Sequence, residues 1–238
     1  MCKWAFLHGT ISNGDYNKVL SFYRQNHRLL NVFELSSPGG NVLEAIKIGK
    51  LMRKFLMTAW APYPVGEHMF AHTCQGPECA CESACALIWF GAVNRSGRVG
   101  LHRPRIDDPE FGILAPAEAT KVYRRVLDEI AKYLDEMEAP RSMIDAMVAT
   151  NSADIRWVDA DKDGLERPPS IAEWADATCG YITNEEKNAK EELSMKEMNG
   201  SLSSKEAIFL KLLREKDTKR AQCWLALRFS QVEQLPPP

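Results

Sequence analysis

Two kinds of hydrophobic pattern, continuous apolar segments and helical spacing, alternate along the first part of the chain. Residues 3–11 and 29–37 are predominantly apolar segments of strand length, and the second closes in a turn, as expected for a strand buried on both faces. Between them, the apolar residues of 16–23 recur at helical spacing. A strand, a helix and a second strand in this order predict a βαβ unit of an α/β fold.

The same alternation continues to about residue 150. A glycine-rich turn at 38–41 opens an amphipathic helix up to Phe55, because the apolar positions there keep a period of 3.6. Residues 63–82 are rich in turn-forming residues and have no period, which predicts a long loop. The remaining expected elements are a strand at 55–62, a helix at 83–92, a turn at 94–97, a strand at 98–104 that includes a histidine, and helices at 115–137 and 140–150.

From Asn184 the composition becomes strongly charged. The segment 199–204, "NGSLSS", divides this region into two expected helices, the second capped by Ser203 or Ser204. Its charges favour a solvated face, with an interaction helix as the alternative. We therefore expect an α/β domain over residues 1–183 and a charged helical C-terminal extension over residues 184–238.

Composition and charge narrow the class of protein. The 238 residues carry 30 Lys and Arg against 32 Asp and Glu, a formal net charge of −2, so no broad electrostatic attraction to nucleic acid or an anionic membrane is expected. No apolar run reaches the roughly 18 to 20 residues of a membrane span, and the first residues lack a signal peptide's pattern. The chain as given is expected in the cytoplasm, and a trimmed leader would instead place it in the periplasm or outside the cell.

Four of the seven cysteines lie close together, at positions 74, 79, 81 and 85. This spacing permits disulfides, free thiols, or a zinc site that also uses His68 and His72. Prolines and glycines in the segment leave a shared helical face for the two histidines unassured, which favours disulfides over zinc. A bridge between Cys81 and Cys85 would enclose Ser83. No metal and no other cofactor are expected.

Two turns carry groups that suit acyl-transfer chemistry. The "SPGG" turn at 37–40 follows a buried strand, and its glycines let backbone N–H groups approach a ligand closely, which suits a developing oxyanion. Ser83 opens the next predicted helix, and His102 stands at the end of the strand that follows, where α/β folds gather their site residues. Ser83 alone is typical of a helix cap, but the three features together favour a nucleophile and its base.

The stretches "ELSSPGGNVLEAIKIGKLM", "SACALIWFGAVNR" and "VGLHRP" occur in this order. They resemble the three core motifs of the Clp protease proteolytic subunit and its relatives in the crotonase-like superfamily, above all the exported or membrane-associated relatives that carry C-x-S-A-C-A. The resemblance spans about residues 4–181 and implies repeated ββα units around a mostly parallel sheet. The loop at 63–82 and the tail after Asn184 have no counterpart in the family.

Carried over to this sequence, the resemblance makes Ser83 the nucleophile and His102 the general base. It assigns the oxyanion hole to the N–H groups of Gly39 and Ala84. It implies a third catalytic residue, an aspartate shortly before an aromatic-aliphatic pair, and Asp154 ahead of Trp157 and Val158 is the favoured choice. Two further aspartates remain as alternatives, at Asp159 and Asp161.

The sequence and the resemblance together predict a serine peptidase that acts on a peptide or protein substrate through an acyl-enzyme. The resemblance further implies a homo-oligomer. Two alternatives remain open: a non-catalytic member of the fold that serves as an assembly or binding module, and a crotonase-type acyl-CoA enzyme. A serine and histidine pair disfavours the acyl-CoA enzyme, because such enzymes typically rely on carboxylates.

Overall fold

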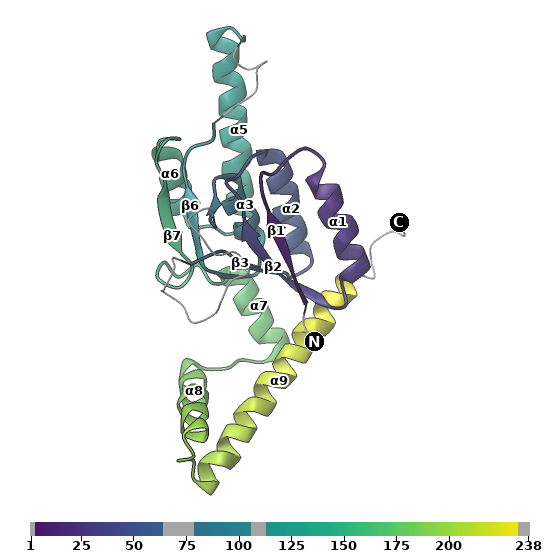
Figure 1. Ribbon diagram of the computed structural model, residues 1–238, viewed down its shortest axis with the longest axis vertical. Helices are drawn as coiled ribbons and strands as arrows, with labels where there is room; N and C mark the ends of the chain where they lie inside the picture. Colours follow the sequence, from purple (N-terminus) through teal and green to yellow (C-terminus); the bar gives the residue numbers. More distant parts are fainter. Residues whose placement is uncertain (1–2, 64–78, 106–112, 233–238) are drawn as a thin grey trace. The chain divides into compact units, whose positions relative to one another are not determined.

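The computed structural model describes residues 3–63, 79–105 and 113–232, and the chain divides into two compact units, Met1–Pro168 and Pro169–Pro238 (Figure 1). The strands of the first unit are β1 (Lys3–His8), β2 (Leu30–Ser36), β3 (Thr58–Trp60), β4 (Cys81–Glu82), β5 (Asn94–Ser96), β6 (Arg98–Leu101) and β7 (Arg156–Asp159). Its helices are α1 (Asp15–Asn26), α2 (Val42–Lys54), α3 (Ala84–Gly91), α5 (Pro116–Glu136) and α6 (Arg141–Ala149).

The strands of the first unit form two sheets. Four strands in the order β1-β2-β3-β5 pair in parallel. In the second sheet, β4 pairs in parallel with β6, and β6 pairs antiparallel with β7. The expected α/β fold with a mostly parallel sheet and a helical C-terminal part is confirmed.

Three short strands differ from the sequence-based expectation. The end of the expected loop at 63–82 contains β4, which has only two residues, and the expected turn at 94–97 contains the polar strand β5. Neither segment is long enough to have a period, so pairing with a neighbouring strand determines its conformation. The strand β7 was not assigned from the sequence, because its four residues do not alternate: the first two are exposed and the last two are buried.

A short bridge connects the end of β2 to β4. Ser37 pairs in parallel with Cys81: its N–H donates to the carbonyl of Ala80 at 2.7 Å, and its own carbonyl accepts from the N–H of Glu82 at 2.9 Å. The "SPGG" turn begins at this residue. The bridge therefore brings the turn alongside residue 83, although more than forty positions separate them in the sequence.

Helices α2 and α3 approach each other at two glycines. A Cβ built on Gly91 would lie 2.2 Å from the carbonyl oxygen of Gly49, and one built on Gly49 would meet the hydroxyl of Tyr133. That hydroxyl donates to the carbonyl of Leu87 at 2.7 Å, so α5 packs on the same contact. All eight residues of α3 are buried. The helix that begins after Ser83 is therefore held by backbone contacts in the core of the unit.

Two arginines satisfy carbonyl groups at the ends of helices. The guanidinium of Arg95 donates to the carbonyls of Phe90 and Met137, and Arg53 donates to Gly91 and Met137. These carbonyls lie at the C-terminal ends of α3 and α5, where a helix lacks internal partners and attracts positive charge. Burial, together with the neighbouring Arg53, lowers the pKa of Arg95 to about 9.

The second unit consists of helices α7 (Pro169–Cys179), α8 (Asn184–Met198) and α9 (Ser204–Val232). Leu193 of α8 packs against two buried leucines of α9, Leu210 and Leu213. Of the two expected caps of the last helix, the one used is Ser203, which exchanges hydrogen bonds with Glu206. No helix in the described part of the chain has an apolar stretch long enough to cross a membrane.

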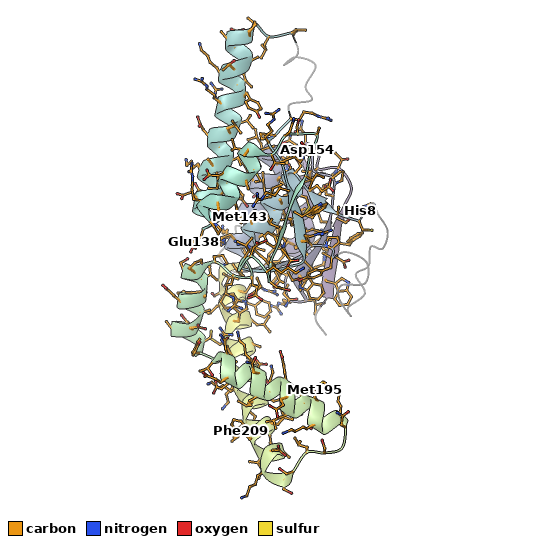
Figure 2. All side chains as sticks on the ribbon, turned by 90° about the vertical axis from the view of Figure 1, so that its left-hand side faces the viewer. His8, Glu138, Met143, Asp154, Met195 and Phe209 are labelled. Atoms are coloured by element: carbon orange, nitrogen blue, oxygen red, sulfur yellow. A yellow bond between two sulfur atoms is a disulfide. The ribbon has the colours of Figure 1, made fainter. Side chains whose placement is uncertain are left out.

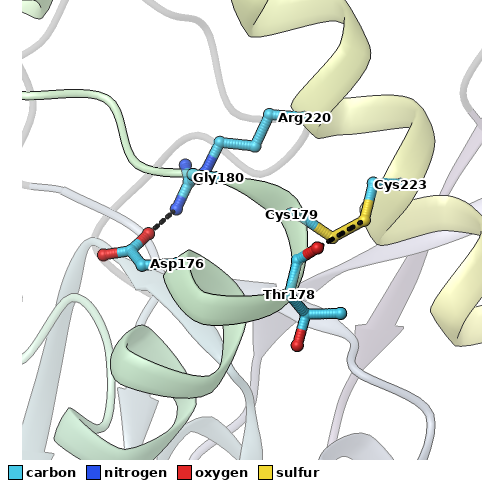
Figure 3. Close-up of a disulfide and its surroundings, with 6 residues drawn as sticks. All are labelled: Asp176, Thr178, Cys179, Gly180, Arg220 and Cys223. Carbon is cyan, nitrogen blue, oxygen red and sulfur yellow. Dashed lines mark hydrogen bonds and ion pairs between the residues drawn. A yellow bond between two sulfur atoms is a disulfide. The ribbon is translucent and has the colours of Figure 1, made fainter.

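A disulfide joins α7 to α9 within this unit. Cys179 and Cys223 form it across a separation of 44 residues, and the ion pair between Asp176 and Arg220 lies beside it (Figure 3). Closing a loop of this length restricts the unfolded chain substantially. The sequence analysis missed this disulfide because two isolated cysteines so far apart carry no local signal.

Candidate active site

Ser83 is the residue that joins β4 to α3, and its backbone adopts an unusual conformation. Its φ is 57° and its ψ is −123°, a region that residues other than glycine rarely occupy and that costs about 1–3 kcal/mol. Its N–H donates to the carbonyl of Gly100 at 2.9 Å, and its carbonyl accepts from Ala86 at 3.0 Å. A serine held in a sharp strand-to-helix turn has the arrangement of a nucleophile elbow.

The side chain of Ser83 does not act as a helix cap. Although the residue stands at the N-cap position of α3, its hydroxyl makes no capping hydrogen bond. A capping serine typically has an extended backbone and accepts from the second or third amide of the helix. The helix-cap role, which is typical of a serine at such a position, is therefore not observed for Ser83.

The strained backbone of Ser83 leads to a test by substitution. We expect Ser83→Gly to be more stable than Ser83→Ala by about 1 kcal/mol, because glycine relieves the strain at positive φ and this gain exceeds its greater chain entropy. Midpoints of chemical denaturation under oxidising conditions measure the difference. At an unstrained position the order is reversed, so a less stable glycine variant would show that Ser83 is not strained.

A disulfide encloses the elbow. Cys81, two residues before Ser83, bonds to Cys85, two residues after it, with their Cα atoms 5.2 Å apart, and both side chains are fully buried. The bridge therefore links the strand and the helix on either side of the serine and restricts the turn between them. Cys79 is disulfide-bonded as well. Cys74 and the two histidines of the alternative zinc site, His68 and His72, lie outside the described residues.

The "SPGG" turn lies directly against the elbow. Gly39 has a φ of 101°, and a Cβ built on it would be 2.7 Å from the Cβ of Ser83 and 3.1 Å from the amide nitrogen of Ala84. Only glycine can bring the turn this close. The N–H of Gly39 donates to the hydroxyl of Ser37 at 3.1 Å. In contrast, the N–H groups of Ala84 and Gly40 have no acceptor among the described residues.

The expected oxyanion hole consists of two of these amides, those of Gly39 and Ala84. The structure places both Gly39 and Ala84 beside Ser83, but the Gly39 amide is engaged within its own turn. It can donate to an oxyanion only if it leaves the Ser37 hydroxyl. The Ala84 amide belongs to the first residue of α3, where the helix dipole also favours negative charge.

His102 follows the last residue of β6 and is half-buried. Because β4 and β6 are parallel, Ser83 and His102 lie at the same edge of the sheet. The Nδ1 atom of His102 is 2.8 Å from the carbonyl oxygen of Arg103. A carbonyl can only accept, so Nδ1 donates and the neutral ring keeps the Nε2 lone pair as a base.

The two groups are not joined by a hydrogen bond. The Ser83 hydroxyl has no hydrogen-bond partner among the described residues. The hydrogen bond of the His102 ring goes to the carbonyl of Arg103. Catalytic hydrogen bonds are often long or open in the absence of substrate. The structure brings the two residues to one edge of the sheet without closing the contact between them.

The register of β6 and β7 distinguishes the three aspartates. Leu101 pairs with Arg156 at the end of β6 next to His102, whereas Arg98 pairs with Asp159 at the other end. Four strand residues span about 13 Å, so Asp154 lies toward His102 while Asp159 lies far from it.

The hydrogen bonds of the aspartates agree with this division. Asp159 is buried and accepts from the N–H of Asp161, and the Asp161 carboxylate accepts from the hydroxyl of Tyr63 at 3.0 Å. Both residues therefore hold the turn after β7. Asp154 is exposed (Figure 2), and its carboxylate makes no hydrogen bond to His102. The expected contact between the acid and the base is not formed.

One titratable residue beside Ser83 was missed from the sequence. Burial raises the pKa of Glu82, and the positive charge of His102 acts in the opposite direction. A carboxylic acid directly before the candidate nucleophile was visible in the sequence. Its relation to His102 was not, because that relation depends on the pairing of β4 with β6.

The comparisons with known proteins concern the arrangement of elements. No protein-family model matches the chain, and no curated protein matches it. Among solved structures, a mutant of ClpP1 from Listeria monocytogenes is similar at 16% identity and a TM-score of 0.47, over 68% of this chain and 88% of that one. A mutant of the membrane-bound stomatin-specific protease 1510-N is similar at 18% identity and a TM-score of 0.43, over 76% of this chain and 85% of that one. Identities this low say nothing about chemistry, which has to come from the residues of this chain.

Proposed function

We propose that the chain is a serine hydrolase, most specifically a peptidase, that acts through an acyl-enzyme on a peptide or protein substrate. The observation that supports it best is the strained, uncapped Ser83 between a strand and a helix. A non-catalytic protein has no need to keep a serine in this conformation, whereas a nucleophile has to be exposed above a helix N-terminus.

In the proposed reaction, the Ser83 oxygen attacks the substrate carbonyl carbon while Nε2 of His102 takes the hydroxyl proton. The carbonyl oxygen becomes an oxyanion, which the N–H of Ala84 and an N–H of the "SPGG" turn stabilise. As the C–N bond breaks, His102 gives its proton to the leaving amine and an ester to Ser83 remains. Water then attacks this ester, His102 takes the water proton and returns a proton to Ser83, and the acid product leaves.

Asp154 is the favoured third residue among the three aspartates. It stands two residues before β7, at the end of the strand where Arg156 pairs with Leu101 next to His102. Its exposed carboxylate would have to approach the ring to orient it. No cofactor takes part in the proposed reaction.

Covalent labelling tests the proposal. Intact, oxidised protein is incubated with a fluorophosphonate, and peptide mapping by mass spectrometry locates the adduct. We expect the adduct on Ser83. If the folded protein takes up no probe and hydrolyses no peptide or ester, the hydrolase proposal is wrong and the alternative of a binding module takes its place.

We also propose that the chain forms a homo-oligomer. Apolar side chains are exposed on α5, on α6 and just before α5: Val122, Val148 at 46% and Ile113 at 85%. Such exposed apolar groups favour association. Multi-angle light scattering at tens of micromolar is expected to give a mass above 26.8 kDa, the mass of one chain. A single species at that mass would contradict the expectation.

A further inference from the structure

One face of the second sheet carries both Glu82 and His102. Glu82 of β4 pairs with Gly100 of β6, and neighbours in register have their side chains on the same face. His102 stands two residues after Gly100, and alternate residues of an extended chain also share a face. The carboxylate next to the candidate nucleophile therefore extends from the face that carries the candidate base.

Gly100 leaves room for the Glu82 side chain. A Cβ built on Gly100 would lie 3.1 Å from Cγ of Glu82 and 2.7 Å from Cγ2 of Ile155. The Glu82 methylene groups thus lie over the glycine, beside Ile155 and Trp157 of the neighbouring segment. Each of these two apolar side chains is 38% exposed. The stem of the Glu82 side chain therefore lies in apolar surroundings.

The described segments next to this pair carry further charged side chains. Burial raises the pKa of Glu82, and the His102 charge opposes that shift, so the two groups interact electrostatically. The further charged side chains are Arg103 beside His102, the exposed Asp154, and two arginines of the β6–β7 pair. Arg156 pairs with Leu101 next to His102, and Arg98 stands at the other end of β6, with its guanidinium 4.5 Å from the ring centre of Trp157. Glu82 is the half-buried negative group among them.

We propose that Glu82 supplies the negative charge that stabilises protonated His102, while the carbonyl of Arg103 fixes the tautomer of the ring. In a catalytic triad, one carboxylate performs both tasks. Here the Nδ1 hydrogen bond goes to a backbone carbonyl, and the charge comes from the residue before the nucleophile. Glu82 is then a positioning residue that acts through His102. This inference rests on the proposed hydrolase function and replaces Asp154 as the acid of the site.

The proposal predicts a loss of rate in one conservative variant and no change in a matched control. In Glu82→Gln, the rate of Ser83 labelling at its pH plateau should fall about three- to fivefold, because an electrostatic interaction between partly exposed groups is worth roughly that factor. The acid limb of the labelling profile should move to lower pH, because the protonated ring loses its stabilising charge. In Glu118→Gln, a matched change on the exposed first turn of α5, rate and profile should stay within about twofold of the unmodified protein.

A second measurement does not depend on reactivity. Carboxyl carbon NMR follows the titration of Glu82 in the intact protein, in His102→Gln and in Asp154→Asn. Removing the His102 charge should raise the pKa of Glu82 further, whereas Asp154→Asn should leave it in place. An unchanged Glu82 titration in folded His102→Gln overturns the inference, as does a loss of labelling in Asp154→Asn that exceeds the loss in Glu82→Gln. If Ser83 takes up no probe while the Glu82 titration still responds, the hydrolase function fails and the electrostatic pair remains.

Discussion

Ser83→Ala and His102→Ala are each expected to reduce fluorophosphonate labelling and peptide hydrolysis by a factor on the order of 10⁴ to 10⁶. The serine oxygen forms the covalent bond and the imidazole accepts its proton, so either loss removes the same step. The double variant should therefore react no more slowly than either single variant. Second-order labelling rates and steady-state hydrolysis of a peptide ester measure the effect.

The control is Ser12→Ala. Ser12 is exposed, and its hydroxyl makes one long contact of 3.4 Å to the carbonyl of Thr10. Its variant should label at the normal rate. Circular dichroism and the oligomeric mass must be unchanged in every variant, because an unfolded protein also fails to react. If folded Ser83→Ala is still labelled, the nucleophile is another residue.

The elements with a clear hydrophobic pattern were predicted from the sequence. The alternation of β1, α1 and β2 and the amphipathic α2 were predictable, because a buried strand leaves a continuous apolar segment and a half-buried helix leaves a period of 3.6. The strand β4 was not, since two residues carry no period, yet its pairing with Ser37 is what brings the "SPGG" turn to the elbow. The chemistry of Ser83 was suggested by the residue type and its neighbours. Its positive φ depends on contacts that no local pattern specifies.

The acidic residue of the candidate site could not be identified from the sequence alone. The resemblance favoured Asp154 and left Asp159 and Asp161 as alternatives, and the antiparallel register of β6 and β7 separates Asp154 from Asp159. The parallel pairing of β4 with β6 puts Glu82 opposite Gly100, on the face that also carries His102. The sequence alone does not show in which register two strands pair. A shift of one residue in the pairing moves a side chain to the opposite face of the sheet, so the neighbours of a carboxylate cannot be predicted from the sequence.

Gly91→Ala is expected to destabilise the first unit by about 3 kcal/mol or more. The added Cβ would lie 2.2 Å from the carbonyl oxygen of Gly49 and 2.5 Å from its Cα. Both atoms belong to the backbone of α2, so no side chain can rotate away, and the two helices have to separate. Overpacking of a core typically costs about 1–3 kcal/mol where side chains can adjust, and here they cannot. Urea denaturation followed by tryptophan fluorescence measures the loss, with Ala117→Ser on the exposed start of α5 as a control expected within about 0.5 kcal/mol.

The same substitution should also affect the site. Helix α3 runs from Ala84 to Gly91 without an exposed residue, so a displacement at its end moves the whole helix and the amide of Ala84 with it. Labelling of Ser83 should fall even in conditions where Gly91→Ala is still folded, since a misplacement of about 1 Å can cost on the order of a hundredfold in rate. In Gly49→Ala the added Cβ meets the far end of the Tyr133 side chain, and combining it with Tyr133→Phe should restore part of the lost stability. No such partner exists for Gly91→Ala, and a Gly91→Ala protein as stable as the unmodified one would mean that α2 and α3 do not pack through these glycines.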